Sequence, residues 1–145
     1  MAEFRRPESV LVLVYVDRSR VLLLRRVAPF SFWQSVTGSL DGGETPLDTA
    51  RRELFEETGL SGEGILSGPV ATRTFTIDPR WRDRFAPGVT ENTEHEFRFR
   101  LPAVADIRLD PGEHAAHRWL DIDSAIERVW SWTNKEALEM LRDEL

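Results

Sequence analysis

The sequence predicts an α/β (α+β) fold with strands and helices in layers, and three observations lead to this prediction. Two apolar runs rich in aliphatic and β-branched residues, at 10–16 and 20–26, are typical of buried strands. Segments with helical periodicity alternate with further strand-like segments along the chain. A length of 145 residues is enough to bury a hydrophobic core, so we expect a single domain over residues 1–145.

The first two strands are expected to form a β-hairpin. The run VLVLVYV at 10–16 is followed by Asp17-Arg18-Ser19, which are turn-forming residues. The run RVLLLRR at 20–26 then returns as the second strand. A short segment at 33–36 is expected to be strand or loop, and it leads into a glycine-containing loop.

The second half of the chain alternates strand-like and loop-like segments. A Gly/Ser-rich connection is expected at 61–68. The segments at 70–77 and 94–101 are predicted strands, and the second of them alternates polar and apolar residues. The stretch 78–93 between them is rich in Arg, Pro and Gly and predicts a long loop of the kind that is often functional. A last strand at 117–120 and two helices complete the expected elements, the helices at 121–128 and 134–145.

The composition limits the classes of partner. A net charge of −6 does not favour binding to nucleic acid polymers or to an anionic membrane surface. The chain has no cysteine, so neither a disulfide nor a thiolate metal site can form. The N-terminal residues do not resemble a signal peptide, and no apolar run is long enough to span a membrane, so we expect a cytoplasmic protein.

A helix is predicted over 46–58 from its end signals. Thr45 suits the N-cap, Pro46 suits the first helical position, and Gly59 suits a left-handed stop. At the helical period, one stripe of the helix is apolar or small and is expected to face the core; it consists of Leu47, Ala50, Leu54 and Thr58.

The same helix carries three carboxylates within five residues, Glu53, Glu56 and Glu57. Like charges at this spacing repel one another, and a bound divalent cation would turn the repulsion into attraction. Oxygen ligands without His or Cys favour Mg²⁺, with Mn²⁺ as a substitute. Arg52 can pair with Glu56, and Glu44, which closes the glycine loop, can point at the same site. The alternative is an acidic helix face that is simply solvated.

The segment 38–60 resembles the Nudix hydrolases. Their signature is Gly, five residues, Glu, seven residues, Arg-Glu, an aliphatic residue, any residue, Glu-Glu, any residue, Gly and an aliphatic residue. Every defined position matches, with the residues Gly38, Glu44, Arg52, Glu53, Leu54, Glu56, Glu57, Gly59 and Leu60. The resemblance implies a mixed β-sheet sandwiched between α-helices and hydrolysis of a small-molecule diphosphate linked to another group.

The resemblance also implies roles for the acidic residues. By motif position, Glu53, Glu56 and Glu57 are metal ligands, while Glu44 and Arg52 support the loop and the helix. A carboxylate must also act as general base towards water. In this family the base lies either in the signature helix or in a separate loop, so both positions stay open.

Two long runs are similar to one branch of the family, the enzymes that release pyrophosphate from dihydroneopterin triphosphate in bacterial folate synthesis. They are FWQSVTGS at 32–39 and RFAPGVTENTE at 84–94, and the similarity extends from about Arg5 to Asn134. It implies that Glu113 is a third metal-ligating carboxylate outside the helix. It implies substrate contacts at four positions, namely Arg5 (in place of a lysine), Arg25, Thr37 and Ser131. Trp33 is a further candidate, because an aromatic wall suits a flat pterin ring.

Several of these residues have plain structural alternatives. Trp33, Trp119 and Trp132 can be core aromatics, and Glu113 can be a surface residue. Arg25 and Arg26 end a strand, where either can be a solvated charge. The three histidines are interpreted as incidental. The carboxylates of Glu94 and Glu96 share one face of a strand, which is either solvated or supplies another ligand or base.

Three functions compete on this sequence. The first is a pyrophosphohydrolase of dihydroneopterin triphosphate. The second is a Nudix enzyme acting on (deoxy)nucleoside triphosphates, 8-oxo-dGTP or dinucleoside polyphosphates, because guanine and a pterin share one pyrimidinone edge. The third is a non-catalytic sensor with the same fold, against which the retention of Glu53, Glu56 and Glu57 argues.

Overall fold

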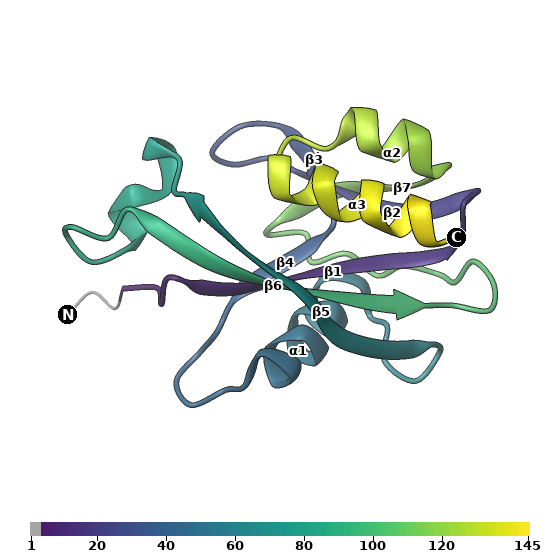
Figure 1. Ribbon diagram of the computed structural model, residues 1–145, viewed down its shortest axis with the longest axis horizontal. Helices are drawn as coiled ribbons and strands as arrows, with labels where there is room; N and C mark the ends of the chain where they lie inside the picture. The colour runs from purple at the N-terminus through teal and green to yellow at the C-terminus, as the bar shows by residue number, and fades with distance from the viewer. Residues whose placement is uncertain (1–3) are drawn as a thin grey trace.

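The computed structural model describes residues 4–145 and contains a mixed, seven-stranded sheet with helices on both faces (Figure 1). The strands are β1 (Glu8–Asp17), β2 (Arg20–Arg26), β3 (Phe32–Gln34), β4 (Val36–Ser39), β5 (Ile65–Thr76), β6 (Glu91–Arg100) and β7 (His114–Leu120). The helices are α1 (Pro46–Thr58), the 3₁₀ helix η1 (Pro79–Arg84), α2 (Ile122–Arg128) and α3 (Trp132–Glu144). The predicted layered fold is therefore confirmed.

Strand β1 organises the sheet. It pairs in antiparallel fashion with β2 and β4 and in parallel with β6, and the sheet order is β3-β2-β1-β6-β5, with β7 joined to β2. The expected hairpin of β1 and β2 is present, with Tyr15 opposite Val21. Because β1 lies inside the sheet and helices cover both faces, its residues from Val10 to Val14 are almost fully buried.

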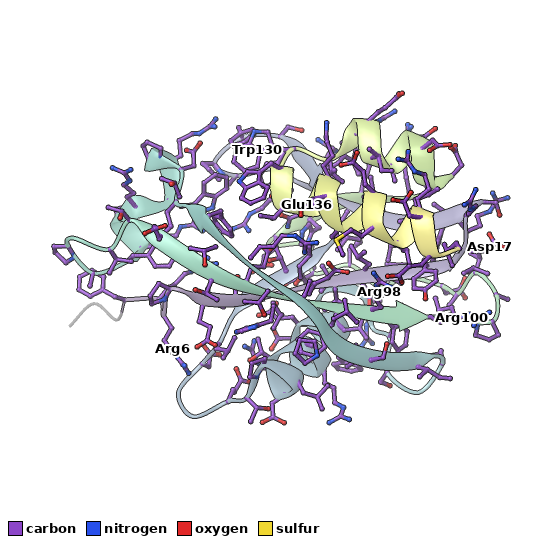
Figure 2. The ribbon with its side chains drawn as sticks, in the orientation of Figure 1. Arg6, Asp17, Arg98, Arg100, Trp130 and Glu136 are labelled. Carbon is purple, nitrogen blue, oxygen red and sulfur yellow. The ribbon has the colours of Figure 1, made fainter. Side chains whose placement is uncertain are left out.

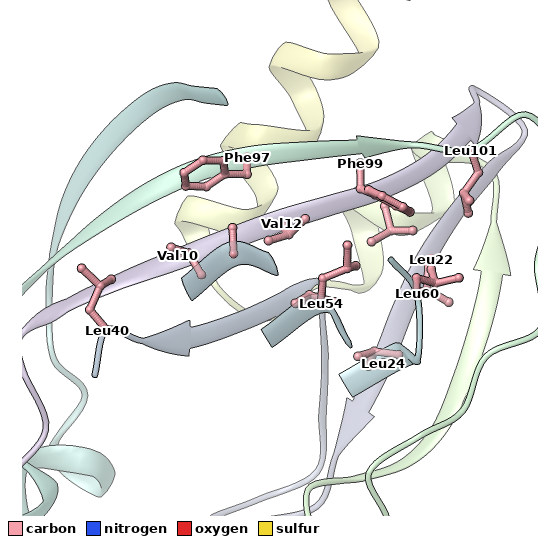
Figure 3. Packing of buried hydrophobic residues seen from close by; sticks show 13 residues of the cluster. Val10, Val12, Leu22, Leu24, Leu40, Leu54, Leu60, Phe97, Phe99 and Leu101 are labelled. Carbon is pink, nitrogen blue, oxygen red and sulfur yellow. The ribbon is translucent and has the colours of Figure 1, made fainter. Parts of the chain in front are cut away.

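Alternate residues of β1 belong to two separate cores. Val10 and Val12 pack with Phe97 of β6 and Leu54 of α1 on one face (Figure 3). Leu11 and Leu13 pack against α2 and α3 on the other face. Side chains of a strand point alternately to the two faces, so a continuous apolar run is what a strand covered on both faces requires.

Several element boundaries differ from the sequence-based expectations. Strand β5 begins at Ile65, inside the expected connection at 61–68, because the strand continues through Gly68 and Pro69 with a shift of register against β6 between Ser67 and Ala71. Gly and Pro in a strand mark such irregularities as well as turns. The expected loop at 78–93 contains η1, and both β6 and β7 begin three residues early. None of the helices over residues 4–145 has the length and apolar character needed to cross a membrane.

Candidate active site

Helix α1 is held in place by its predicted ends. The Thr45 side chain accepts a hydrogen bond from the Asp48 amide, and the Asp48 carboxylate accepts one from the Thr45 amide, which makes a capping box. Gly59 ends the helix at φ 77°, in the left-handed region. The expected stripe packs on the core, with Ala50 and Leu54 almost inaccessible to solvent. The neighbouring stripe, which carries Glu53 and Glu57, is thereby directed at β4 and β7.

Glu57 is buried without a hydrogen-bond donor for its carboxylate. Its side chain is 1% exposed, and neither carboxylate oxygen accepts a hydrogen bond from an N–H or O–H group within residues 4–145. Burial raises the pKa of Glu57 well above its ordinary value, and the adjacent Glu53 and Glu113 carboxylates act in the same direction. Burial likewise raises the pKa of Glu53. Two carboxylates in contact can share a proton or hold a cation between them, but they cannot both stay ionised without cost.

A second element brings further ligand atoms to Glu57. One atom each from Glu57, Glu113 and His114 lies within 4.8 Å of the other two. The His114 ring is fully buried, with Nε2 3.6 Å from a Glu57 oxygen and 3.2 Å from Nε2 of Gln34. Burial lowers the pKa of His114 to about 4, so the ring is neutral near neutral pH. The expected third carboxylate, Glu113, is therefore placed beside the helix.

Arg52 connects the glycine loop to the helix. Its Nε and Nη2 donate to both carboxylate oxygens of Glu44 at 2.8 and 2.9 Å, and Nη2 also donates to the Ser39 carbonyl. Its Nη1 donates to Glu53 at 2.8 Å and to Glu56 at 3.3 Å. The Arg52 hydrogen bonds lower the pKa of Glu44 to about 2. Glu44 and Arg52 thus support loop and helix as expected, and Glu56 is half exposed beside Arg52, away from the buried group.

Gly38 leaves room for a carboxylate. A Cβ atom at this position would overlap the side chain of Glu53. Gly38 does not have a positive φ, whereas Gly42 in the same loop has φ 45°. The first glycine of the signature is therefore explained by close approach to Glu53 and not by an unusual backbone conformation.

A cavity of about 680 Å³ opens beside these carboxylates. Its lining includes Glu53 and Glu113 together with the cationic side chains of Arg5, Arg6 and Arg26. Burial lowers the pKa of Arg26, and Glu113 is the charge that most opposes this shift. A volume of this size suits a small molecule.

The expected substrate residues divide between this cavity and other positions. Thr37 and Ser131 line the cavity, as does Arg5, but Arg25 and Trp33 do not. The predicted substrate contacts of Arg25 and Trp33 therefore stay predictions without support from the cavity lining. Arg25 and Trp33 are paired across β2 and β3, so they share a face, and Trp33 packs on the core under α2 and α3. Arg26 takes the other face because successive strand residues alternate.

Aromatic side chains form one wall of the cavity. The rings of Phe32, Trp81 and Trp130 line it, and Phe30 packs with all three at centroid distances of 4.7–5.8 Å. The Arg80 guanidinium lies 3.9 Å from the centroid of Phe30. Figure 2 shows Trp130 beside the first turn of α3. These aromatics come from three separate segments, so the sequence, which favoured Trp33, offered no spacing that would have joined them.

Glu94 and Glu96 are buried under α3, not solvated, and they differ in their partners. Glu96 is inaccessible to solvent and pairs with Arg73 at 2.7 Å and with Arg98 at 3.2 Å. Arg98 lies below α3 in Figure 2, where it also pairs with Glu144. Glu94 instead lines the cavity, and its Oε1 atom is buried without a hydrogen-bond partner. Glu96 is thus a structural ion-pair residue, while Glu94 is free to meet a ligand.

The fold and the capped acidic helix together define a known class of protein. A family model described as "NUDIX domain" matches residues 5–141, so the chain belongs to the Nudix family. It is accordingly a hydrolase, and the family resemblance seen in residues 38–60 is confirmed.

Particular relatives within the family match most of the chain. The dihydroneopterin triphosphate diphosphatase of Escherichia coli (strain K12) is 41% identical over 140 residues, which are 94% of this chain and 92% of that protein. The enzyme of the same name from Haemophilus influenzae is 36% identical over 96% of this chain and 89% of its own length. A solved structure of the E. coli dihydroneopterin triphosphate pyrophosphohydrolase superposes with a TM-score of 0.90 at 40% identity, covering 98% of this chain and 99% of that one.

Proposed function

We propose that the protein is a metal-dependent pyrophosphohydrolase that converts dihydroneopterin triphosphate to dihydroneopterin monophosphate and pyrophosphate. The names and the extensive similarity of the relatives support the substrate. A cavity that joins carboxylates, arginines and an aromatic wall supports it as well. A cytoplasmic location goes with this proposal, because a triphosphate carries several charges and does not cross an apolar bilayer core unaided.

The observation that supports a bound metal ion is the burial of Glu57 without a hydrogen-bond donor. Such a carboxylate is costly to bury unless a cation compensates it. The residues present fit a hard divalent ion: Glu53, Glu57 and Glu113 would hold it, with Mg²⁺ as the proposed ion and Mn²⁺ as a substitute. Glu56 can join them only by leaving Arg52. A bound ion of this kind neutralises charge on phosphoryl oxygens and lowers the pKa of water.

The protein's own groups position the reaction. Arg52 holds one oxygen of Glu53, which fixes that carboxylate against β4. Arg5 and Arg26 supply positive charge to the cavity, where the phosphates would bind. The rings of Phe32, Trp81 and Trp130 offer apolar surface to a flat heteroaromatic ring and exclude water from it. Positioning and electrostatic stabilisation of this kind account for most of phosphoryl-transfer catalysis.

The experiment that tests the function is a comparison of substrates. Pyrophosphate release would be measured with Mg²⁺, and kcat/KM compared for dihydroneopterin triphosphate, dATP, dGTP, 8-oxo-dGTP and diadenosine tetraphosphate. We expect the pterin to be preferred. A higher kcat/KM for a nucleotide would retain the Nudix chemistry and reject the pterin substrate. The absence of turnover on all five with either Mg²⁺ or Mn²⁺ would favour a non-catalytic sensor.

A further inference from the structure

Glu94 lies in the cavity but belongs neither to the acidic cluster of Glu53, Glu57 and Glu113 nor to the arginines or the aromatic wall. It is 6% exposed, yet it contributes to the cavity lining, and its Oε1 atom has no hydrogen-bond partner in residues 4–145. The Thr133 hydroxyl favours the charged form, but burial outweighs it and raises the pKa of Glu94 to about 7. A buried acceptor without a donor is uncommon in a native structure and calls for a ligand or a bound group.

The position of Glu94 separates it from the phosphate end of the cavity. Glu94 is the register partner of Ser9, and both lie on the face of the sheet that α3 covers. Glu53, by contrast, approaches Gly38 on the face covered by α1. The cavity reaches both faces, because its lining contains Glu53 as well as Glu94. A substrate with its phosphates near Glu53 has room in the same cavity to extend its ring towards Glu94 and the aromatic wall.

We infer that Glu94 is the residue that selects the ring of the substrate, by accepting two hydrogen bonds from a 2-amino-4-oxopyrimidine edge. Such an edge presents a ring N–H and an exocyclic amino group side by side, and the two oxygens of one carboxylate match that pair. The inference rests on the proposed function, in which a pterin is the substrate. Guanine presents the same edge, whereas adenine and hypoxanthine lack the pair of donors.

A pair of nucleotides tests the contact directly. dITP differs from dGTP only in lacking the 2-amino group. Binding of both would be measured by calorimetry with Ca²⁺ in place of Mg²⁺, so that hydrolysis does not interfere. For the native chain we expect dGTP to bind at least about 10-fold more tightly than dITP, the scale of one hydrogen bond to a charged group.

The variant Glu94→Gln should bring the two dissociation constants to within about threefold, because an amide opposes one donor with its own NH₂ group. Glu91→Gln is the matched control. Glu91 lies on the same strand, exposed and on the opposite face, so this variant should keep the preference for dGTP. Glu94→Asp, which keeps the charge on a shorter side chain, provides a second test should the amide variant not fold.

Three results would overturn the inference. They are equal binding of dGTP and dITP by the native chain, no binding of dGTP up to about 1 mM, and an unchanged preference in Glu94→Gln. Turnover of dihydroneopterin triphosphate separates this inference from the proposed function. An enzyme that hydrolyses the pterin but ignores the 2-amino group keeps its function and loses this role for Glu94. Selective binding of dGTP without turnover of the pterin would keep the contact of Glu94 with the 2-amino group and reject the proposed function.

Discussion

Within residues 4–145, Glu57 is the one carboxyl group with both oxygens buried and without a hydrogen-bond partner. Its carboxylate is buried against Glu53 and Glu113, and no N–H or O–H group of residues 4–145 reaches it. Such a group is destabilising in the metal-free chain, and it lies against Glu53 and Glu113, which line a cavity together with three arginines. A position that lowers stability in this way is characteristic of a functional site.

The substitution Glu57→Gln should therefore separate activity from stability. It removes a ligand charge and keeps the shape, so we expect kcat to fall by at least about 10²-fold, the effect of losing one preorganised electrostatic group. The melting temperature of the metal-free protein should stay the same or rise, because a buried charge is removed. Glu127→Gln, on an exposed turn of α2, is the control and should change neither. A kcat within about threefold of the native value would exclude Glu57 as a ligand.

Because of Glu94, we expect the free energy of unfolding to depend on pH. Its pKa is about 7 in the folded chain against an ordinary value of 4.5, and the surrounding charges are Arg73, His95 and Glu96. Between these two pH values the folded protein binds a proton that the unfolded chain has lost. The contribution of Glu94 is thus fully present below about pH 4.5 and is lost as pH rises to about 7, for a total of about 3 kcal/mol.

The variant Glu94→Gln cannot lose a proton, so its stability relative to the native chain should increase over that range. The measurement is urea unfolding of both proteins with EDTA at several pH values from about 4.5 to about 8. The contributions of the other titrating groups are the same in both proteins, so they cancel in the difference between the two free energies of unfolding. A difference that does not change with pH would mean that Glu94 ionises normally in the folded protein.

The loop between β4 and α1 helps to position the carboxylates of Glu44 and Glu53. Arg52 clamps Glu44 and Glu53 at one side, and Gly38 leaves the space that the Glu53 side chain occupies. A capped helix that follows a short loop holds these groups more firmly than a mobile loop would. Within this element, the roles of Glu44 and Arg52 agree with the sequence-based expectation, whereas Glu56 lies beside Arg52 and not with the buried carboxylates.

Gly38→Ala should displace Glu53 without unfolding the helix. The added methyl group meets the flexible side chain of Glu53 and not a backbone atom, so the carboxylate moves aside. We expect kcat to fall by about tenfold or more while the melting temperature changes by only a few degrees, since a displacement of about 1 Å is costly for catalysis. Gly43→Ala is the matched control, because a Cβ there has nothing within 4 Å. Equal activity of the two variants would contradict this role for Gly38.

The whole molecule is expected to respond to metal, because the site joins distant parts of the chain. Glu53 and Glu57 come from α1, and Glu113 comes from the segment before β7. A cation that binds only the folded state stabilises it by about 2.7 kcal/mol at a concentration 100 times its dissociation constant. For a chain of 145 residues this corresponds to a rise in melting temperature of roughly 5–10 °C.

Saturating Mg²⁺ or Mn²⁺ should produce that rise in a thermal melt, and EDTA should reverse it. Glu57→Gln should lose most of the rise, while Glu127→Gln should keep it. An unchanged melting temperature of the native chain at high Mg²⁺ would contradict a metal site that is completed by folding.

The local features of this protein could be predicted from its sequence, because each depends on residues close together in the chain. The caps of α1, its buried stripe and the pair of Arg52 with Glu56 follow from helical geometry. The β1–β2 hairpin and the mixed sheet follow from apolar runs and from the Nudix resemblance. The predicted start of β5 was wrong, because Gly68-Pro69 is typical of a turn but lies inside the strand.

Only the tertiary structure decided which residues meet in the cavity. Arg26 faces it and Arg25 does not, because the orientation of β2 in the sheet determines which side of an alternating strand is used. Phe32, Trp81 and Trp130 converge from three segments, and His114 reaches Glu57 from β7. Glu94 and Glu96 have the same parity on one strand, yet Arg73 of β5 and Arg98 of β6 form ion pairs with Glu96 and not with Glu94. Periodicity assigns a residue to a face, but only packing between distant segments determines what that face contacts.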